Sequence, residues 1–215
     1  MALFPQIAAS TFKTLGHLKE MKNIYKMTKR KLQKISDPIS RAQHAYKKVD
    51  EFTNEVLDDE IVQKHLQCKK GCSACCHTQV SITHDEGALL AKIIEDGFPV
   101  DWHRLYRQKE AGNSFSEYFK IPYEERKCIF LDSEGGCSIY ENRSMVCRTN
   151  NVVSPAANCD TRVETRPTIR LINTHKSNMV IYSAFEVSSG GTLPKVLWDT
   201  LEKAKKVPLF LGKRP

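Results

Sequence analysis

The chain has 215 residues, 40% of them hydrophobic and 27% charged, which is enough to build a domain with a real core. Its longest apolar runs, such as residues 179–182, are too short to cross a bilayer, which excludes an integral membrane protein. The net charge of +8 is concentrated near the N-terminus, where residues 1–48 hold eleven Lys and Arg against Glu20 and Asp37.

Residues 1–66 predict a basic helical extension ahead of a domain at residues 67–215. Apolar residues recur at steps of three or four over residues 15–35 with lysines between them, which predicts an amphipathic helix. Pro38 is expected to stop or kink it, and a second helical pattern runs over residues 40–65. No secretory signal pattern opens the chain, so we expect a cytoplasmic protein.

The basic helix allows three interpretations. The first is packing on the domain with solvated lysines. The second is docking on an anionic membrane surface or on a protein partner. Nucleic acid ranks last, because few aromatic residues lie between the lysines and no reading motif is present.

A short strand and a capped helix follow the segment of residues 68–77. Val80 and Ile82 alternate with polar neighbours, which favours a strand. Thr83 and Glu86 have the spacing of a capping box, and Gly97 is expected to end the helix.

The C-terminal half predicts an α+β fold. Residues 101–120 are expected to be helical, with an interruption at Gly112. Residues 128–131 and 137–140 are two β-prone runs, which predict a hairpin that would hold Cys128 and Cys137. An irregular loop over residues 141–166, strands over residues 168–172 and 179–185, and a helix after residues 188–192 complete the expected small cysteine-rich domain.

Clustered thiols in a reducing compartment are more often metal ligands than disulfides. A bridge between the adjacent Cys75 and Cys76 would also strain the peptide that joins them. Thiolate suits zinc and iron–sulfur clusters, and four sulfurs satisfy either site. The predicted metal ligands are Cys68, Cys72, Cys75, Cys76, Cys128, Cys137, Cys147 and Cys159.

Neighbouring side chains of extended backbone point to opposite faces, so Cys75 and Cys76 would more naturally serve two metals. We therefore prefer a polynuclear site, with an iron–sulfur cluster ahead of zinc. The alternative is one structural zinc on four cysteines, with the other four as small buried hydrophobic residues. Among the flanking cations, which would lower thiol pKa values, Arg143 and Arg148 are expected to brace the site by hydrogen bonds to sulfur or to backbone carbonyls. The cations are Lys69, Lys70, Arg126, Lys127, Arg143 and Arg148.

The motif GCSACC, the acidic Glu86 at the start of a helix, and the block CIFLDSEGGCSIYENRSMVCR together resemble the YkgJ-like CxxCxxCC cysteine-cluster family. The resemblance covers residues 68–159 and implies a zinc- or iron-chelating domain. Two features depart from the family pattern: the first cysteine gap has three residues instead of two, and Ser144 stands where an Arg-Pro pair is usual.

Three functions are compatible with these patterns. The first is a metal-binding protein that holds an iron–sulfur or multi-zinc centre for redox chemistry or metal handling. The second is a modifying enzyme, for example methyltransferase-like, which requires an open metal position or a cofactor pocket beside the site. The third is a structural zinc module that presents the basic helix to a partner. The sequence identifies no catalytic residue and no substrate.

Overall fold

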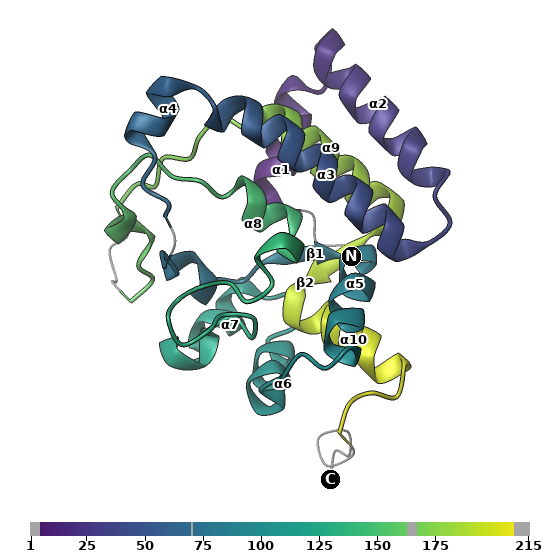
Figure 1. Cartoon of the computed structure of the whole chain (residues 1–215), viewed down its shortest axis with the longest axis vertical. Helices are drawn as coiled ribbons and strands as arrows, with labels where there is room; N and C mark the ends of the chain where they lie inside the picture. The colour runs from purple at the N-terminus through teal and green to yellow at the C-terminus, as the bar shows by residue number, and fades with distance from the viewer. Residues whose placement is uncertain (1–4, 70, 163–166, 209–215) are drawn as a thin grey trace.

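The computed structural model describes residues 5–69, 71–162 and 167–208. Figure 1 shows two neighbouring groups of helices, one built on α9 and the other on α5 and α10. Within the described residues no helix has the length and apolarity that a membrane span requires. The α-helices are α1 (Gln6–Leu15), α2 (Lys19–Gln33), α3 (Pro38–Leu57), α4 (Glu60–His65), α5 (His84–Glu95), α6 (Trp102–Glu110), α7 (Phe115–Lys120), α8 (Met145–Thr149), α9 (His175–Ser188) and α10 (Leu193–Lys203). The remaining elements are the strands β1 (Ser81–Thr83) and β2 (Gly190–Thr192) and the 3-10 turns η1 (Ala74–His77), η2 (Tyr123–Arg126), η3 (Tyr140–Asn142) and η4 (Ala156–Cys159).

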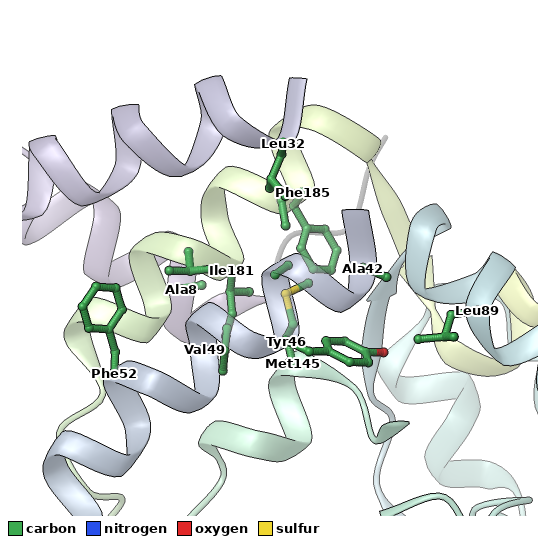
Figure 2. Close-up of a cluster of buried hydrophobic side chains, with 13 residues drawn as sticks. Ala8, Leu32, Ala42, Tyr46, Val49, Phe52, Leu89, Met145, Ile181 and Phe185 are labelled. Carbon is green, nitrogen blue, oxygen red and sulfur yellow. The ribbon is translucent and has the colours of Figure 1, made fainter. Parts of the chain in front are cut away.

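The first core forms where α1, α2 and α3 pack against α9. Leu32, Val49 and Ile181 are each no more than 2% exposed, and Figure 2 shows them turned toward a common interior. Met145 of α8 and Leu89 of α5 join the same cluster. The expectation that the basic helix packs on the rest of the chain is therefore confirmed. Its lysines are exposed except for Lys29, which is half-buried and forms an ion pair with Glu186 of α9 at 2.8 Å.

The second core lies between α5, α6 and α10. Trp198, Leu90 and Leu105 are almost completely buried there. Cys128 and Cys137 are partly buried against this cluster, so the core gives the cysteine-bearing loop an apolar support.

A two-stranded antiparallel sheet joins the two helical groups, and it confirms the α+β class. β1 pairs with β2 in the register Ser81 with Thr192 and Thr83 with Gly190. A Cβ at Gly190 would lie 2.2 Å from the carbonyl oxygen of Ile82, so this close approach requires glycine.

Local sequence signals correctly predict the helix ends that depend on neighbouring residues. The Thr83 side chain accepts from the Glu86 N–H and the Glu86 side chain accepts from the Thr83 N–H, which is the predicted capping box at the start of α5. Gly97 at φ +108° and Gly112 at φ +57° follow α5 and α6. Both occupy the left-handed region that favours glycine.

Two of the predicted helical segments are divided differently. The helix expected over residues 15–35 is interrupted at residues 16–18, because α1 and α2 both fold back onto α9, and Phe12 stacks on Tyr182 at 3.9 Å. Pro38 starts α3 rather than ending the helix before it, with Asp37 as the N-cap that accepts from the Ser40 N–H at 2.7 Å.

The strand predicted over residues 179–185 is wrong, because this run is the buried centre of α9. A short apolar run does not distinguish a strand from a helix that is buried on most of its sides. The strand over residues 168–172 is reduced to one bridge, in which Leu171 pairs with Val152.

The predicted hairpin at residues 128–140 is also reduced. The chain does reverse there, because Leu131 forms an antiparallel bridge with Cys137, but neither run is a regular strand. The loop expected over residues 141–166 contains α8 and η4, while its residues 163–166 lie outside the described part. Ser144 is the N-cap of α8 and accepts from the Cys147 N–H. The sequence analysis did not predict this short helix.

Replacement of Leu32 by alanine tests the packing of α2 on α9. Leu32 is 2% exposed, so the Leu32→Ala variant should lose about 2–5 kcal/mol of unfolding free energy in urea titrations. Met27 lies on the same helix and is 71% exposed, so Met27→Ala should change stability by no more than about 0.5 kcal/mol. Equal effects of the two substitutions would contradict this packing.

His44 on α3 should make stability depend on pH. Burial, together with the nearby Lys31, Lys48 and Lys47, lowers the His44 pKa below its usual 6.5 in the folded state. The unfolded chain therefore binds the proton more tightly, and stability should fall as the pH drops through 6.5 toward the folded pKa. Unfolding of His44→Gln, compared with the original chain at pH 5 and pH 8, should show a weaker loss at the acidic pH; identical pH profiles would contradict this.

Candidate metal centre

Seven of the eight cysteines lie on loops and 3-10 turns, and Cys147 lies on a short helix. Cys75 and Cys76 are on η1, Cys147 is on α8 and Cys159 is on η4. All eight thiols are free, so no disulfide scaffold forms. Cys159 is buried and the other seven are half-buried.

Backbone contacts join the first four cysteines to the later ones. The Cys128 N–H donates to the carbonyl oxygen of Cys76 at 2.8 Å. The Val152 N–H donates to Cys68 Sγ at 3.3 Å, and Cys68 Sγ lies 3.8 Å from the carbonyl oxygen of Asn150. Loops that are 50 to 85 residues apart in sequence are thus held together by the main chain as well as by side chains.

The thiols also influence one another electrostatically. Burial, with a smaller contribution from the charges of nearby cysteines, raises the pKa of Cys128 to about 11 and that of Cys147 to about 12. Burial likewise raises the pKa of Cys159, and the charges of Cys75 and Cys68 add to this rise. Each of the eight sulfurs lies near enough to another cysteine for the charge of one to affect the pKa of the other.

The adjacent Cys75 and Cys76 correct one sequence-based expectation. They lie in a 3-10 turn rather than in extended backbone, so the premise that their side chains must diverge is wrong. The Cys76 thiol donates to Cys75, which lowers the pKa of Cys75 and raises that of Cys76. Their closeness favours neither one metal nor two.

The donor set fits a zinc or iron centre by its chemistry, because eight free soft sulfurs gather in one region. The sulfurs do not form a finished coordination shell. Among the described residues, no three His, Cys, Asp or Glu side chains are arranged to hold one metal ion. The structure therefore brings the predicted ligands into one neighbourhood and does not assign any of them to a particular metal.

Arg148 braces this region as expected. Its guanidinium donates to the carbonyl oxygens of Arg143, at 2.9 Å, and Glu141. It also forms an ion pair with Asp50 of α3 and lies over the Tyr46 ring, with Cζ 4.3 Å from the ring centroid. The side chain is 5% exposed, so these contacts replace nearly all of its hydration.

Arg143 acts on the thiols mainly through its charge. Its Cζ lies 4.0 Å from the centroid of the Tyr140 ring. The positive charge helps to lower the pKa of Cys75 and opposes the rise at Cys68 and Cys137. Of the other flanking cations, Lys70 lies outside the described residues.

Glu86 connects the capped helix α5 to α8. One carboxylate oxygen accepts from the Thr83 N–H at 2.8 Å, and the other accepts from the Met145 N–H at 2.9 Å. The side chain is fully buried, and burial raises its pKa. The acidic position is thus structural, because it fixes the helix that carries Cys147.

His77 lies beside the thiols, and its ring stacks on Tyr123 with the centroids 4.2 Å apart. Its Nδ1 lies 3.2 Å from the Ser73 carbonyl oxygen. Asp50 and Asn150 are site residues that the sequence analysis missed. One comes from the basic extension and the other is a loop amide, and neither belongs to a recognisable motif.

Free cysteines on loops that two cores support define a small cysteine-rich metal-binding domain. Residues 67–170 match the model of the CxxCxxCC family, described as "Putative zinc- or iron-chelating domain", so this segment is similar to the domains of that family. Comparisons with curated proteins and with solved structures gave no match.

Replacement of Arg148 by lysine should destabilise the fold although the charge is kept. Lysine cannot reproduce the planar fork that reaches Asp50 and two carbonyl oxygens. We expect a loss of about 1.5–3 kcal/mol in urea unfolding. Arg162→Lys is the matched control, because Arg162 pairs with Asp160 at the surface, where such pairs contribute about 0–1 kcal/mol. A change at position 148 no larger than that control would contradict this role.

Proposed function

We propose that this protein holds an iron–sulfur or multi-zinc centre through its clustered cysteines and uses it for redox chemistry or metal handling. The supporting observation is the set of eight free thiols, each of which lies near enough to another cysteine to influence it electrostatically. Four sulfurs suffice for one zinc or one cubane cluster. A group twice that size has capacity for two metals or for a larger assembly.

The electrostatic environment of the thiols favours a bound cation. Burial is the largest cause of the raised pKa values of Cys128 and Cys147. A bound cation would remove both the desolvation cost and the repulsion between neighbouring thiolates. Arg143 would offset part of the remaining negative charge. We rank an iron–sulfur cluster ahead of zinc, because sulfide bridges allow many cysteines to share one assembly.

Metal and sulfide analysis of anaerobically purified protein tests the kind of centre. Iron and acid-labile sulfide in comparable amounts, with a visible absorption band that reductant bleaches reversibly, would support an iron–sulfur cluster in a redox role. Two or more zinc ions per chain without sulfide would support the multi-zinc form. One zinc per chain would contradict a polynuclear site and favour a structural module.

Serine replacements of Cys75 and Cys76 test whether the paired thiols are ligands. Each of Cys75→Ser and Cys76→Ser should lower the bound metal per chain, because a hydroxyl is a much poorer ligand than thiolate for these metals. Ser73→Ala changes a neighbour in the same loop and should keep the full metal content. Unchanged metal in both cysteine variants would remove these residues from the site and with them the proposal of a shared centre.

A further inference from the structure

A cavity of about 620 Å³ opens between α1, α9, β1 and α8. Its volume lies within the usual range of pockets for small ligands. Ala8 and Ile181, which Figure 2 shows in the first core, also line this cavity. One wall is therefore apolar and is formed by the packed helices themselves.

None of the described residues around the cavity is Asp, Glu, Lys or Arg, although 27% of the chain is charged. The polar part is made instead of hydroxyl and carboxamide groups, with one histidine, His175. A charged ligand would lose its hydration here without gaining an ionic partner, so the cavity favours an uncharged molecule.

Several carboxamides of the lining are held in place by the fold. Asn178 is 4% exposed and donates through Nδ2 to Thr11 Oγ1 at 3.2 Å. Asn113 accepts from the Thr192 N–H at 3.1 Å through Oδ1. In each case one end of the amide is used by the protein. The described residues supply no partner for the Asn178 oxygen or the Asn113 nitrogen, so a ligand that reached these two lining residues would find one acceptor and one donor.

The cavity shares a wall with the cysteine cluster. Asn150 lines it, and the carbonyl oxygen of the same residue lies 3.8 Å from Cys68 Sγ. The Asn150 side chain also lies near enough to Cys75 to help lower the pKa of that thiol. Val146 and Thr149, on either side of Cys147 along α8, are further lining residues. A molecule in the cavity would therefore lie one residue away from the thiols.

We propose that this cavity binds a small uncharged ligand that carries an amide or a nitrogen heterocycle, beside the cysteine cluster. Such a ligand can accept from Asn113 and donate to Asn178 while its apolar part contacts the helices. Metal storage or a structural zinc needs no such cavity. The site therefore goes beyond the metal-binding function, and it supplies the pocket that a modifying enzyme would require.

Matched pairs of probes test the preference for uncharged ligands. Nicotinamide and adenosine are compared at millimolar concentration with their anionic counterparts, nicotinate and adenosine monophosphate, by amide chemical-shift changes in the full chain. At least one neutral probe should shift the resonances of cavity residues in a saturable manner, and its anion should bind about tenfold more weakly or not at all. Equal binding within a pair, shifts confined to other surfaces, or no binding of either neutral probe would overturn the proposal.

Substitutions in the cavity locate the binding site. Ser81→Phe should fill part of the space next to β1 and abolish binding, whereas Ser10→Phe, on the exposed side of α1, should leave it unchanged. Asn178→Ala removes one fixed carboxamide without adding bulk and should weaken binding about tenfold. This second variant decides the outcome if the phenylalanine at position 81 prevents folding. Unaltered binding in a folded Ser81→Phe or Asn178→Ala would exclude this cavity.

Metal analysis of the same samples separates this proposal from the metal-binding function. Ser81→Phe should keep the metal content of the original chain while it loses the neutral probe. Cys76→Ser should lose metal. If the original chain holds metal and Cys76→Ser loses it, but the original chain binds no probe, the cavity site alone is refuted. If the original chain binds the probe but holds no metal, the metal centre alone is refuted.

Discussion

A buried guanidinium holds the cysteine region to the helical frame. Arg148 is the point where α3, α8 and the loop before α8 meet, because it contacts Asp50, two backbone carbonyls and the Tyr46 ring. A buried cation is tolerated only when its donors are satisfied, so its partners must remain in place together. Glu86 performs the complementary task with a buried carboxyl group that accepts from the N–H groups at the starts of α5 and α8. The two buried side chains give short loops a fixed position that their own hydrogen bonds would not provide.

Sequence patterns predicted those features that depend on neighbouring residues. The capping box of Thr83 and Glu86 and the helix-ending Gly97 need only local chemistry, and both were found. The strand expected over residues 179–185 failed because burial on most sides of α9 comes from helices that are distant in the chain. The same dependence on distant contacts concealed Asp50 as the partner of Arg148. Residue type identified the eight thiols, and their spacing alone did not reveal the turn at Cys75.

The cysteine loops are anchored in the hydrophobic cores by their apolar residues. Phe130 and Ile139, next to Cys128 and Cys137, are buried in the core of α5, α6 and α10, while Met145 anchors α8 in the core built on α9. The loops that carry the thiols are therefore positioned by apolar packing. Such a framework can accept small changes in the positions of the sulfurs, because apolar side chains and not the thiols stabilise it. This division of roles suits a site whose ligands must rearrange around a cation.

Asn150 gives the cavity and the thiols a common boundary, with thermodynamic consequences for both. Any occupant that displaced this residue would alter its contacts with Cys68 and Cys75 at the same time. If the occupant changes the affinity of the sulfurs for a cation by some factor, thermodynamic linkage requires the cation to change the affinity of the cavity for the occupant by the same factor. A single loop amide would thus be sufficient to make metal loading sensitive to the concentration of a neutral metabolite.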